Sequence, residues 1–197
     1  MGHGAGAQST GRDHSRLRAA GSPRALVVGY GNSYRRDDGV GRAVVNALRG
    51  ELGQPDLGPL DDGFAELGRD VDSVLAHQLV PEFAEMLAPY GLVVFVDAAV
   101  GEGAEPLRVE VLAPRPHTSS VSHHLHPATL LDLAGQINGR TPRGLLLSLE
   151  GHDFDFGEGL SPETADLVPQ AVARIRALVD GRDGAGQDRE SMSLSAG

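Results

Sequence analysis

Residues 92–97 constrain the fold more than any other stretch, because five apolar residues precede the final aspartate, Asp97. A strand that is apolar on both faces is typical of the centre of a parallel sheet, where helices cover both sides. Helices on both faces of a mostly parallel sheet form a three-layer α/β/α sandwich. A chain of 197 residues is long enough for one such domain with a substantial core.

The segments around this run alternate between strand-like and helix-like patterns. Residues 98–105 are too few for a helical crossover, which needs about a dozen residues, so we expect the strand at 106–112 to run antiparallel. Its apolar and polar residues alternate, as they do in a half-exposed edge strand. The sequence predicts five strands, at 24–29, 71–76, 92–97, 106–112 and 144–149, and four helices, at 37–49, 83–89, 128–137 and 161–179.

Composition excludes several classes of function. The formal net charge of -10 disfavours general nucleic-acid binding. The chain has no cysteine, which excludes disulfides, thiolate metal sites and a cysteine nucleophile. No apolar run approaches the roughly 18 residues of a membrane span, so we expect a cytoplasmic protein that binds neither nucleic acid nor membrane. Polar, glycine-rich ends predict disordered tails at 1–22 and 181–197, with a single domain at 23–180.

Acidic side chains follow two of the predicted strands. Asp37 and Asp38 come after the first strand, and Asp97 ends the third. Carboxyl ends of parallel strands meet at one edge of a sheet, where open α/β proteins bind their ligands. Two carboxylates and an imidazole suit a divalent metal and leave positions open for a substrate. Taken singly, an aspartate here can instead cap a helix or form a turn. A histidine cluster that can reach the same edge precedes the third helix, and it comprises His123, His124 and His126.

Two other readings of the first loop are disfavoured. Gly29 and Gly31 lie in G-Y-G-N-S-Y, which lacks the third glycine of a dinucleotide-binding loop, and acids occupy the place of the pyrophosphate. A phospho-acceptor receiver domain would need a lysine at the end of its last strand. Residues 148–151 contain none, and neither does any of the chain from Val27 onward. The loop therefore favours a cation over a phosphate.

Several motifs together resemble the hydrogenase maturation proteases. Residues 29–41 (G-Y-G-N, four residues, then D-D-G-V-G) resemble the opening signature of that family, and 77–82 (H-Q-L-V-P-E) resemble a segment of one branch. Residues 95–98 (F-V-D-A) resemble the strand with the second acid, and 149–163 resemble the closing segment. The resemblance spans 24–180 and implies the strand order 2-1-3-5-4, with the fourth strand antiparallel, which we also favour for the pattern above.

The resemblance implies which residues act. Asp38, the second acid of the pair, is the metal ligand and catalytic residue together with Asp97 and His123, and no separate nucleophile is identified. The family histidine precedes a leucine pair at a fixed spacing, which selects His123, with His124 as the alternative. Asp37 is then left to helix capping and loop geometry.

The resemblance also implies a function. Members of the family are endopeptidases that remove a C-terminal extension from the large subunit of a nickel–iron hydrogenase after nickel insertion. The nickel is carried by the substrate, so the protease has no cofactor of its own, and its partner is the large-subunit precursor. We expect a monomer whose loop glycines let the substrate tail approach. Two alternatives stay open on the same fold: a non-catalytic metal- or peptide-binding module, and a metallohydrolase with its own zinc.

Overall fold

The computed structural model describes residues 24–101, 105–116 and 125–181, and the predicted tails lie outside this part of the chain except for Gly181. Its five strands are β1 (Ala25–Tyr30), β2 (Val71–Ala76), β3 (Leu92–Val100), β4 (Leu107–Leu112) and β5 (Arg143–Gly151). They form one sheet in the order β2-β1-β3-β5-β4. All neighbours pair in parallel except β4, which runs antiparallel to β5 at the edge. The predicted strand order and the direction of the fourth strand are both confirmed.

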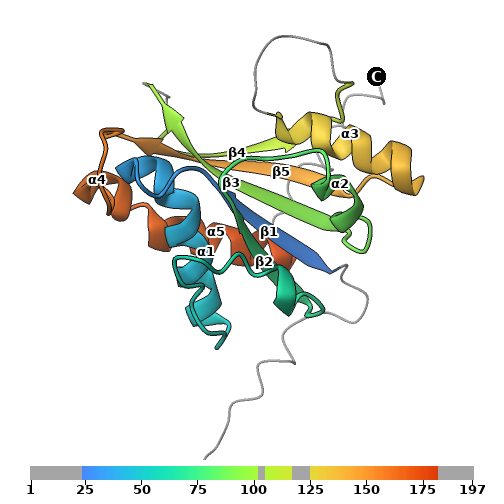
Figure 1. The fold of residues 1–197 in the computed structure, drawn as a ribbon, viewed down its shortest axis with the longest axis horizontal. Helices are drawn as coiled ribbons and strands as arrows, with labels where there is room; N and C mark the ends of the chain where they lie inside the picture. The colour runs from blue at the N-terminus through green and yellow to red at the C-terminus, as the bar shows by residue number, and fades with distance from the viewer. Residues whose placement is uncertain (1–23, 102–104, 117–124, 182–197) are drawn as a thin grey trace, which may run out of the picture.

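Helices cover both faces of the sheet. The helical elements are η2 (Arg36–Gly39), α1 (Val40–Glu51), η3 (Phe64–Glu66), α2 (Phe83–Met86), α3 (Pro127–Asn138), α4 (Pro162–Ala165) and α5 (Val168–Val179). Figure 1 shows α1 and α5 on one side of the sheet and α2 and α3 on the other, which makes the predicted three-layer sandwich. None of the helices within the described ranges is long and apolar enough to cross a membrane.

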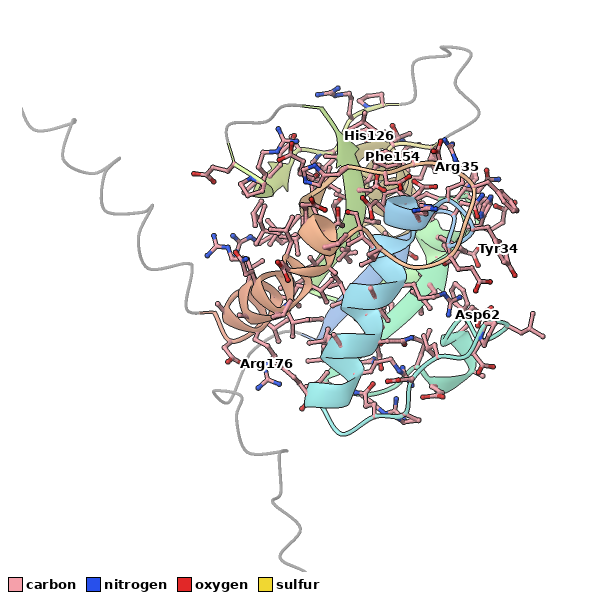
Figure 2. All side chains as sticks on the ribbon, turned by 90° about the vertical axis from the view of Figure 1, so that its left-hand side faces the viewer. Tyr34, Arg35, Asp62, His126, Phe154 and Arg176 are labelled. Atoms are coloured by element: carbon pink, nitrogen blue, oxygen red, sulfur yellow. The ribbon has the colours of Figure 1, made fainter. Side chains whose placement is uncertain are left out.

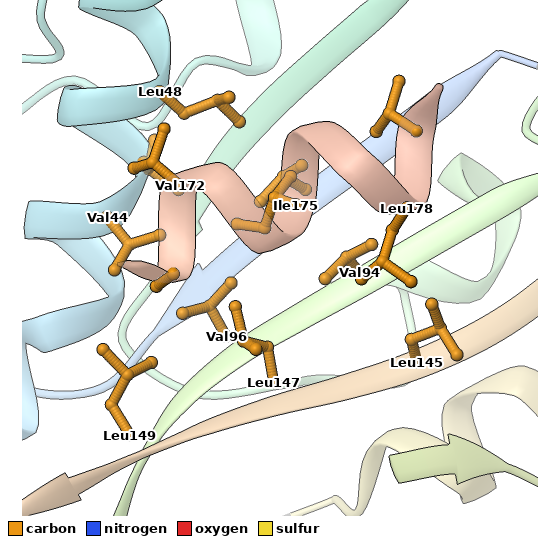
Figure 3. Packing of buried hydrophobic residues seen from close by; sticks show 14 of the residues in the cluster. Val44, Leu48, Val94, Val96, Leu145, Leu147, Leu149, Val172, Ile175 and Leu178 are labelled. Carbon is orange, nitrogen blue, oxygen red and sulfur yellow. The ribbon is translucent and has the colours of Figure 1, made fainter. Parts of the chain in front are cut away.

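The side chains of β3 alternate between two cores, which explains why this strand is apolar throughout. Val94 and Val96 pack against α1 and α5, as Figure 3 shows. Val93 and Phe95 face the opposite way, into the cluster formed with α2 and α3. All four side chains are fully buried. Burying a residue of this size contributes about 1.5–3 kcal/mol, so β3 is the strand on which both layers depend.

Two of the predicted helices differ from the observed ones. The predicted helix at 161–179 is broken into α4 and α5, because Pro169 has no N–H with which to continue the hydrogen-bond ladder. The predicted helix at 83–89 is a single turn, α2, and Pro89 follows it closely. A residue before proline is disfavoured in helical geometry, which accounts for the early end.

The acid pair lies in η2, the turn that leads into α1. Neither η2 nor α1 has a side-chain cap, so the predicted capping role of the pair is wrong. The carboxylate of Asp38 bonds back to the loop before the helix, and that of Asp37 bonds to a loop late in the chain. Both carboxylates therefore accept hydrogen bonds from these more distant donors and not from the free N–H groups at the start of the helix.

Asp97 does not end its strand as predicted. β3 continues to Val100, because β5 pairs with it along its whole length, from Leu92 with Arg143 to Val100 with Gly151. β1 is shorter and ends at Tyr30, one residue beyond the pairing of Gly29 with Val96. Asp97 is therefore level with the last residue of β1, at the edge where the sheet narrows.

Candidate functional site

Asp38 is held at the carboxyl end of β1 by the loop that precedes it. Its Oδ2 accepts a hydrogen bond of 2.9 Å from the backbone N–H of Asn32, and its own N–H donates to the carbonyl of Arg35. Gly31 makes this approach possible, since its φ is +130° and a Cβ there would overlap the carbonyl oxygen of Asp38. The carboxylate is partly exposed, so it is oriented by the protein and still open to a ligand.

Asp97 is oriented from the neighbouring strand by Tyr30. The phenol of Tyr30 donates a hydrogen bond to the Asp97 carboxylate. Burial raises the pKa of the Tyr30 hydroxyl well above its usual range, and the negative charge and hydrogen bond of Asp97 raise it further. The phenol therefore stays protonated and remains a donor. Because η2 packs against β3, Asp38 and Asp97 belong to the same edge of the sheet.

Asp37 is fully buried and ties the first loop to the segment after β5. Its carboxylate accepts bonds of 2.7–2.9 Å from the N–H groups of His152, Asp153 and Ser161 and from the hydroxyls of Ser161 and Thr164. Burial alone would raise the pKa of Asp37, but the bonds donated by these residues outweigh it and lower the pKa from 3.8 to about 2. Its predicted role in loop geometry agrees with this network, whereas the capping role does not.

The two loops are joined by further contacts around Asp37. The N–H of Arg36 donates to the carbonyl of Gly157, and its guanidinium forms a 2.8 Å ion pair with Asp153. The guanidinium of Arg35 donates two bonds to the carbonyl of Phe154, and Figure 2 shows these two residues side by side where α1 begins. Arg36 has a φ of +46°, a left-handed conformation that these contacts hold in place. The loop that carries Asp38 is thus fixed from both ends.

An open groove of about 530 Å³ is lined by residues that contact the two aspartates, although neither aspartate itself lines it. Tyr30, the partner of Asp97, and Asn32, the partner of Asp38, both line it. The groove extends across the ends of β1 and β2 to the loop at 57–62, with the segment at 158–159 also in its wall. Its size lies in the range of about 300–1,000 Å³ that ligand pockets occupy.

The loop that forms the outer wall of this groove is anchored to α1. Arg42 donates to the hydroxyl of Ser33 and to the carbonyls of Leu57 and Gly58, and Asn46 exchanges two bonds with Leu57. Residues 51–70 have the glycine-, proline- and aspartate-rich composition that is typical of a variable surface loop. One short turn of this loop forms η3, and α1 holds the loop as a defined wall.

The predicted histidines are only partly accounted for. His123 and His124 lie outside the described residues. His126 caps α3, because its Nδ1 accepts a 3.1 Å hydrogen bond from the N–H of Ala128. His77 is exposed in the wall of the groove. Within the described ranges, no three histidine or acidic side chains are grouped as a metal site.

Three features of the site could not be predicted from the sequence. In the sequence, Tyr30 cannot be distinguished from the loop residues that follow it. Only the strand register places its phenol beside Asp97. The donors to Asp37 are more than 100 residues away along the chain. The groove depends on the loop at 57–62, whose attachment to Arg42 and Asn46 has no periodic pattern.

No protein-family model matches the sequence, and no curated protein matches it. Solved structures match over most of the chain. The hydrogenase maturating endopeptidase HybD from E. coli is 21% identical, with 82% of this chain and 94% of that chain covered and a TM-score of 0.61. The [NiFe] hydrogenase maturation protease HycI from Thermococcus kodakarensis KOD1 is 20% identical, with 82% and 95% covered and a TM-score of 0.56.

A third match comes from an archaeon. The hydrogenase 2 maturation peptidase from Thaumarchaeota archaeon SCGC_AB-539-E09 is 23% identical, with 79% of this chain and 97% of that chain covered and a TM-score of 0.51. Each of these structures is matched over nearly its full length, so the likeness covers the whole sandwich and not a single motif. The chain has the fold of the hydrogenase maturation endopeptidases, as the resemblance of its sequence implied.

Proposed function

We propose that the protein is an endopeptidase that removes a C-terminal extension from the nickel-loaded large-subunit precursor of a nickel–iron hydrogenase. One observation carries the proposal: Asp38 and Asp97 belong to one sheet edge, and the residues that hydrogen-bond to them, Asn32 and Tyr30, line an open groove. A groove beside two oriented carboxylates suits a protruding polypeptide tail that brings a metal ion with it.

The two carboxylates are arranged before any cation binds. The N–H of Asn32 orients Asp38 and the phenol of Tyr30 orients Asp97, so little rearrangement is needed on binding. Oxygen ligands of this kind bind divalent cations, and a histidine completes a set that also suits nickel. His123, with His124 as the alternative, is the proposed third ligand. The nickel ion belongs to the substrate, so the purified protease should carry no tightly bound metal.

The reaction adds water across one peptide bond of the precursor. The hydroxyl of the water joins the carbonyl carbon, the C–N bond breaks, and the departing nitrogen gains a proton. Binding of the substrate's nickel by Asp38, Asp97 and His123 would hold the scissile carbonyl at the sheet edge, where the metal polarises it. A carboxylate of the pair would accept the proton of the attacking water, which is general-base catalysis.

The test compares nickel-loaded with nickel-free precursor. Wild-type protein should cleave only the nickel-loaded form, and Asp38→Asn, Asp97→Asn and His123→Ala should each leave it unprocessed. Asp166→Asn is the matched control, because this exposed acid at the end of α4 has no side-chain hydrogen bond within the described residues, and the variant should process normally. Full processing by all three site variants would refute the proposal. Cleavage that needs a metal held by the protease itself would favour a metallohydrolase instead.

A further inference from the structure

The groove beside the aspartates carries an inference beyond the choice of reaction. We propose that it binds the stretch of precursor polypeptide next to the cleaved bond, and that the carboxylates in its wall select a basic side chain of that stretch. The inference rests on the proposed function, since it takes the precursor as the ligand.

The place of the groove supports a polypeptide ligand. Its inner end is formed by the two residues that orient the candidate ligands, Tyr30 and Asn32. A chain whose scissile bond lies at Asp38 and Asp97 must continue on either side of that bond. The groove is the open path that starts there and crosses the ends of β1 and β2.

Exposed apolar side chains in the groove wall support an interaction surface. Leu60 is 98% exposed and Tyr34 is 56% exposed, and both line the groove together with the more buried Leu57 and Leu75. A fully exposed leucine contributes nothing to the fold through burial, whereas covering it with a partner recovers about 25 cal/mol for each Å² removed from water. These residues can therefore hold an apolar part of the bound segment.

The charge of the groove indicates what the rest of the segment carries. Three carboxylates line it, those of Asp61, Asp62 and Glu158, against the single guanidinium of Arg42. That guanidinium already donates to Ser33, Leu57 and Gly58, so it holds the wall in place. The acids at 61 and 62 belong to the outer wall beyond β2, away from Asp97 on β3. The charge complement of these three carboxylates is a lysine or arginine of the bound stretch.

Binding of nickel-free precursor tests the groove separately from cleavage, because the proposed reaction does not cleave nickel-free precursor. Glu158→Arg and Leu60→Ser change exposed side chains for which no hydrogen bond is recorded within the described residues. Each should raise the Kd for nickel-free precursor roughly fivefold, which corresponds to the upper range of the energies of exposed contacts. Asp166→Arg makes the same charge change outside the groove and should leave the Kd within twofold.

Precursor variants identify the basic side chain. Each lysine or arginine within ten residues of the cleaved bond is changed to glutamine, one at a time. One of these changes should weaken binding to the wild-type protein by a similar factor. The same change should have little further effect on binding to Glu158→Arg, because the basic side chain and Glu158 contact each other in the wild-type complex. Added salt should likewise weaken binding to the wild type more than to Glu158→Arg.

The inference is overturned if both groove variants bind as tightly as the wild type, or if no basic residue of the precursor matters. Absence of binding to the wild type overturns it as well. Failure of the wild type to cleave nickel-loaded precursor refutes the proposed function, which the binding measurements do not test.

Discussion

Asp37→Asn tests whether the buried carboxylate holds the candidate site together. In the folded protein the carboxylate is fully buried and its pKa is lowered from 3.8 to about 2. A lowered pKa means that folding favours the charged form. The stabilisation is therefore complete above pH 3.8 and is lost as the pH falls towards 2.

The size of the effect follows from the pKa and the hydrogen bonds. The lowering of the pKa from 3.8 to about 2 corresponds to about 2 kcal/mol of stabilisation at neutral pH. An asparagine would place its NH₂ group best at the Oδ1 position, because Oδ2 faces four donors and Oδ1 only the N–H of Ser161. Leaving that one buried N–H without an acceptor costs about 1 kcal/mol more. The variant should thus lose about 3 kcal/mol, or about 6–12 °C in Tm for a domain of this size.

Thermal and urea unfolding of the two proteins at several pH values provide the measurement. The difference in free energy of unfolding should be about 3 kcal/mol at pH 7 and shrink towards about 1 kcal/mol near pH 2. Asp166→Asn, an exposed acid on the same part of the chain, should change stability by less than about 0.5 kcal/mol. A loss below about 1 kcal/mol at pH 7, or one that stays constant from pH 6 to pH 2, would show that the network does not stabilise the fold as described.

Three other substitutions test separate parts of the site. Tyr30→Phe removes the donor to the Asp97 carboxylate and should weaken binding of nickel-loaded precursor about tenfold with little loss of stability; an affinity equal to that of the wild type would exclude an orienting role. Gly31→Ala should destabilise by more than about 2 kcal/mol in urea unfolding, because its φ is +130° and the methyl group would meet backbone, while Gly50→Ala, in open space on α1, should be neutral or slightly stabilising. Arg49→Met removes a buried guanidinium that donates to the carbonyl of Pro55 and to the buried hydroxyl of Ser73, and it should lower stability by about 1–3 kcal/mol in urea unfolding, while Glu66 keeps Arg69 as its partner; a variant as stable as the wild type would show that these bonds are replaceable.

The sheet could be predicted from the sequence because its signals are local. The apolar run that became β3 requires cover on both faces, and the short gap after it fixes the direction of β4. The break between α4 and α5 could also be predicted, since Pro169 lies inside the predicted helix. These features depend on residues within a few positions of one another, where period and backbone chemistry act directly.

The site could be predicted only as far as the edge on which it lies. Asp38 follows a predicted strand and Asp97 was predicted to end one, which places both at that edge, but what orients them depends on register and loop packing. His126 shows the limit most clearly: a histidine before a helix can be a ligand or a cap, and only the 3.1 Å bond to Ala128 identifies it as a cap. The burial of Asp37 beside its partly exposed neighbour likewise depends on donors far along the chain.

The bonds from Asp37 to the segment after β5 have a consequence for the order of assembly. They join residue 37 to residues 152–164, so closing this contact encloses most of the chain between β1 and α4. Contacts of such long sequence separation form late in folding, because the entropy of closing a large loop must be overcome first. A nascent chain that has made only β1, α1 and β2 would hold the acid pair without the donors that fix it. The site that we assign to maturing another protein is therefore itself expected to be the last part of this one to mature.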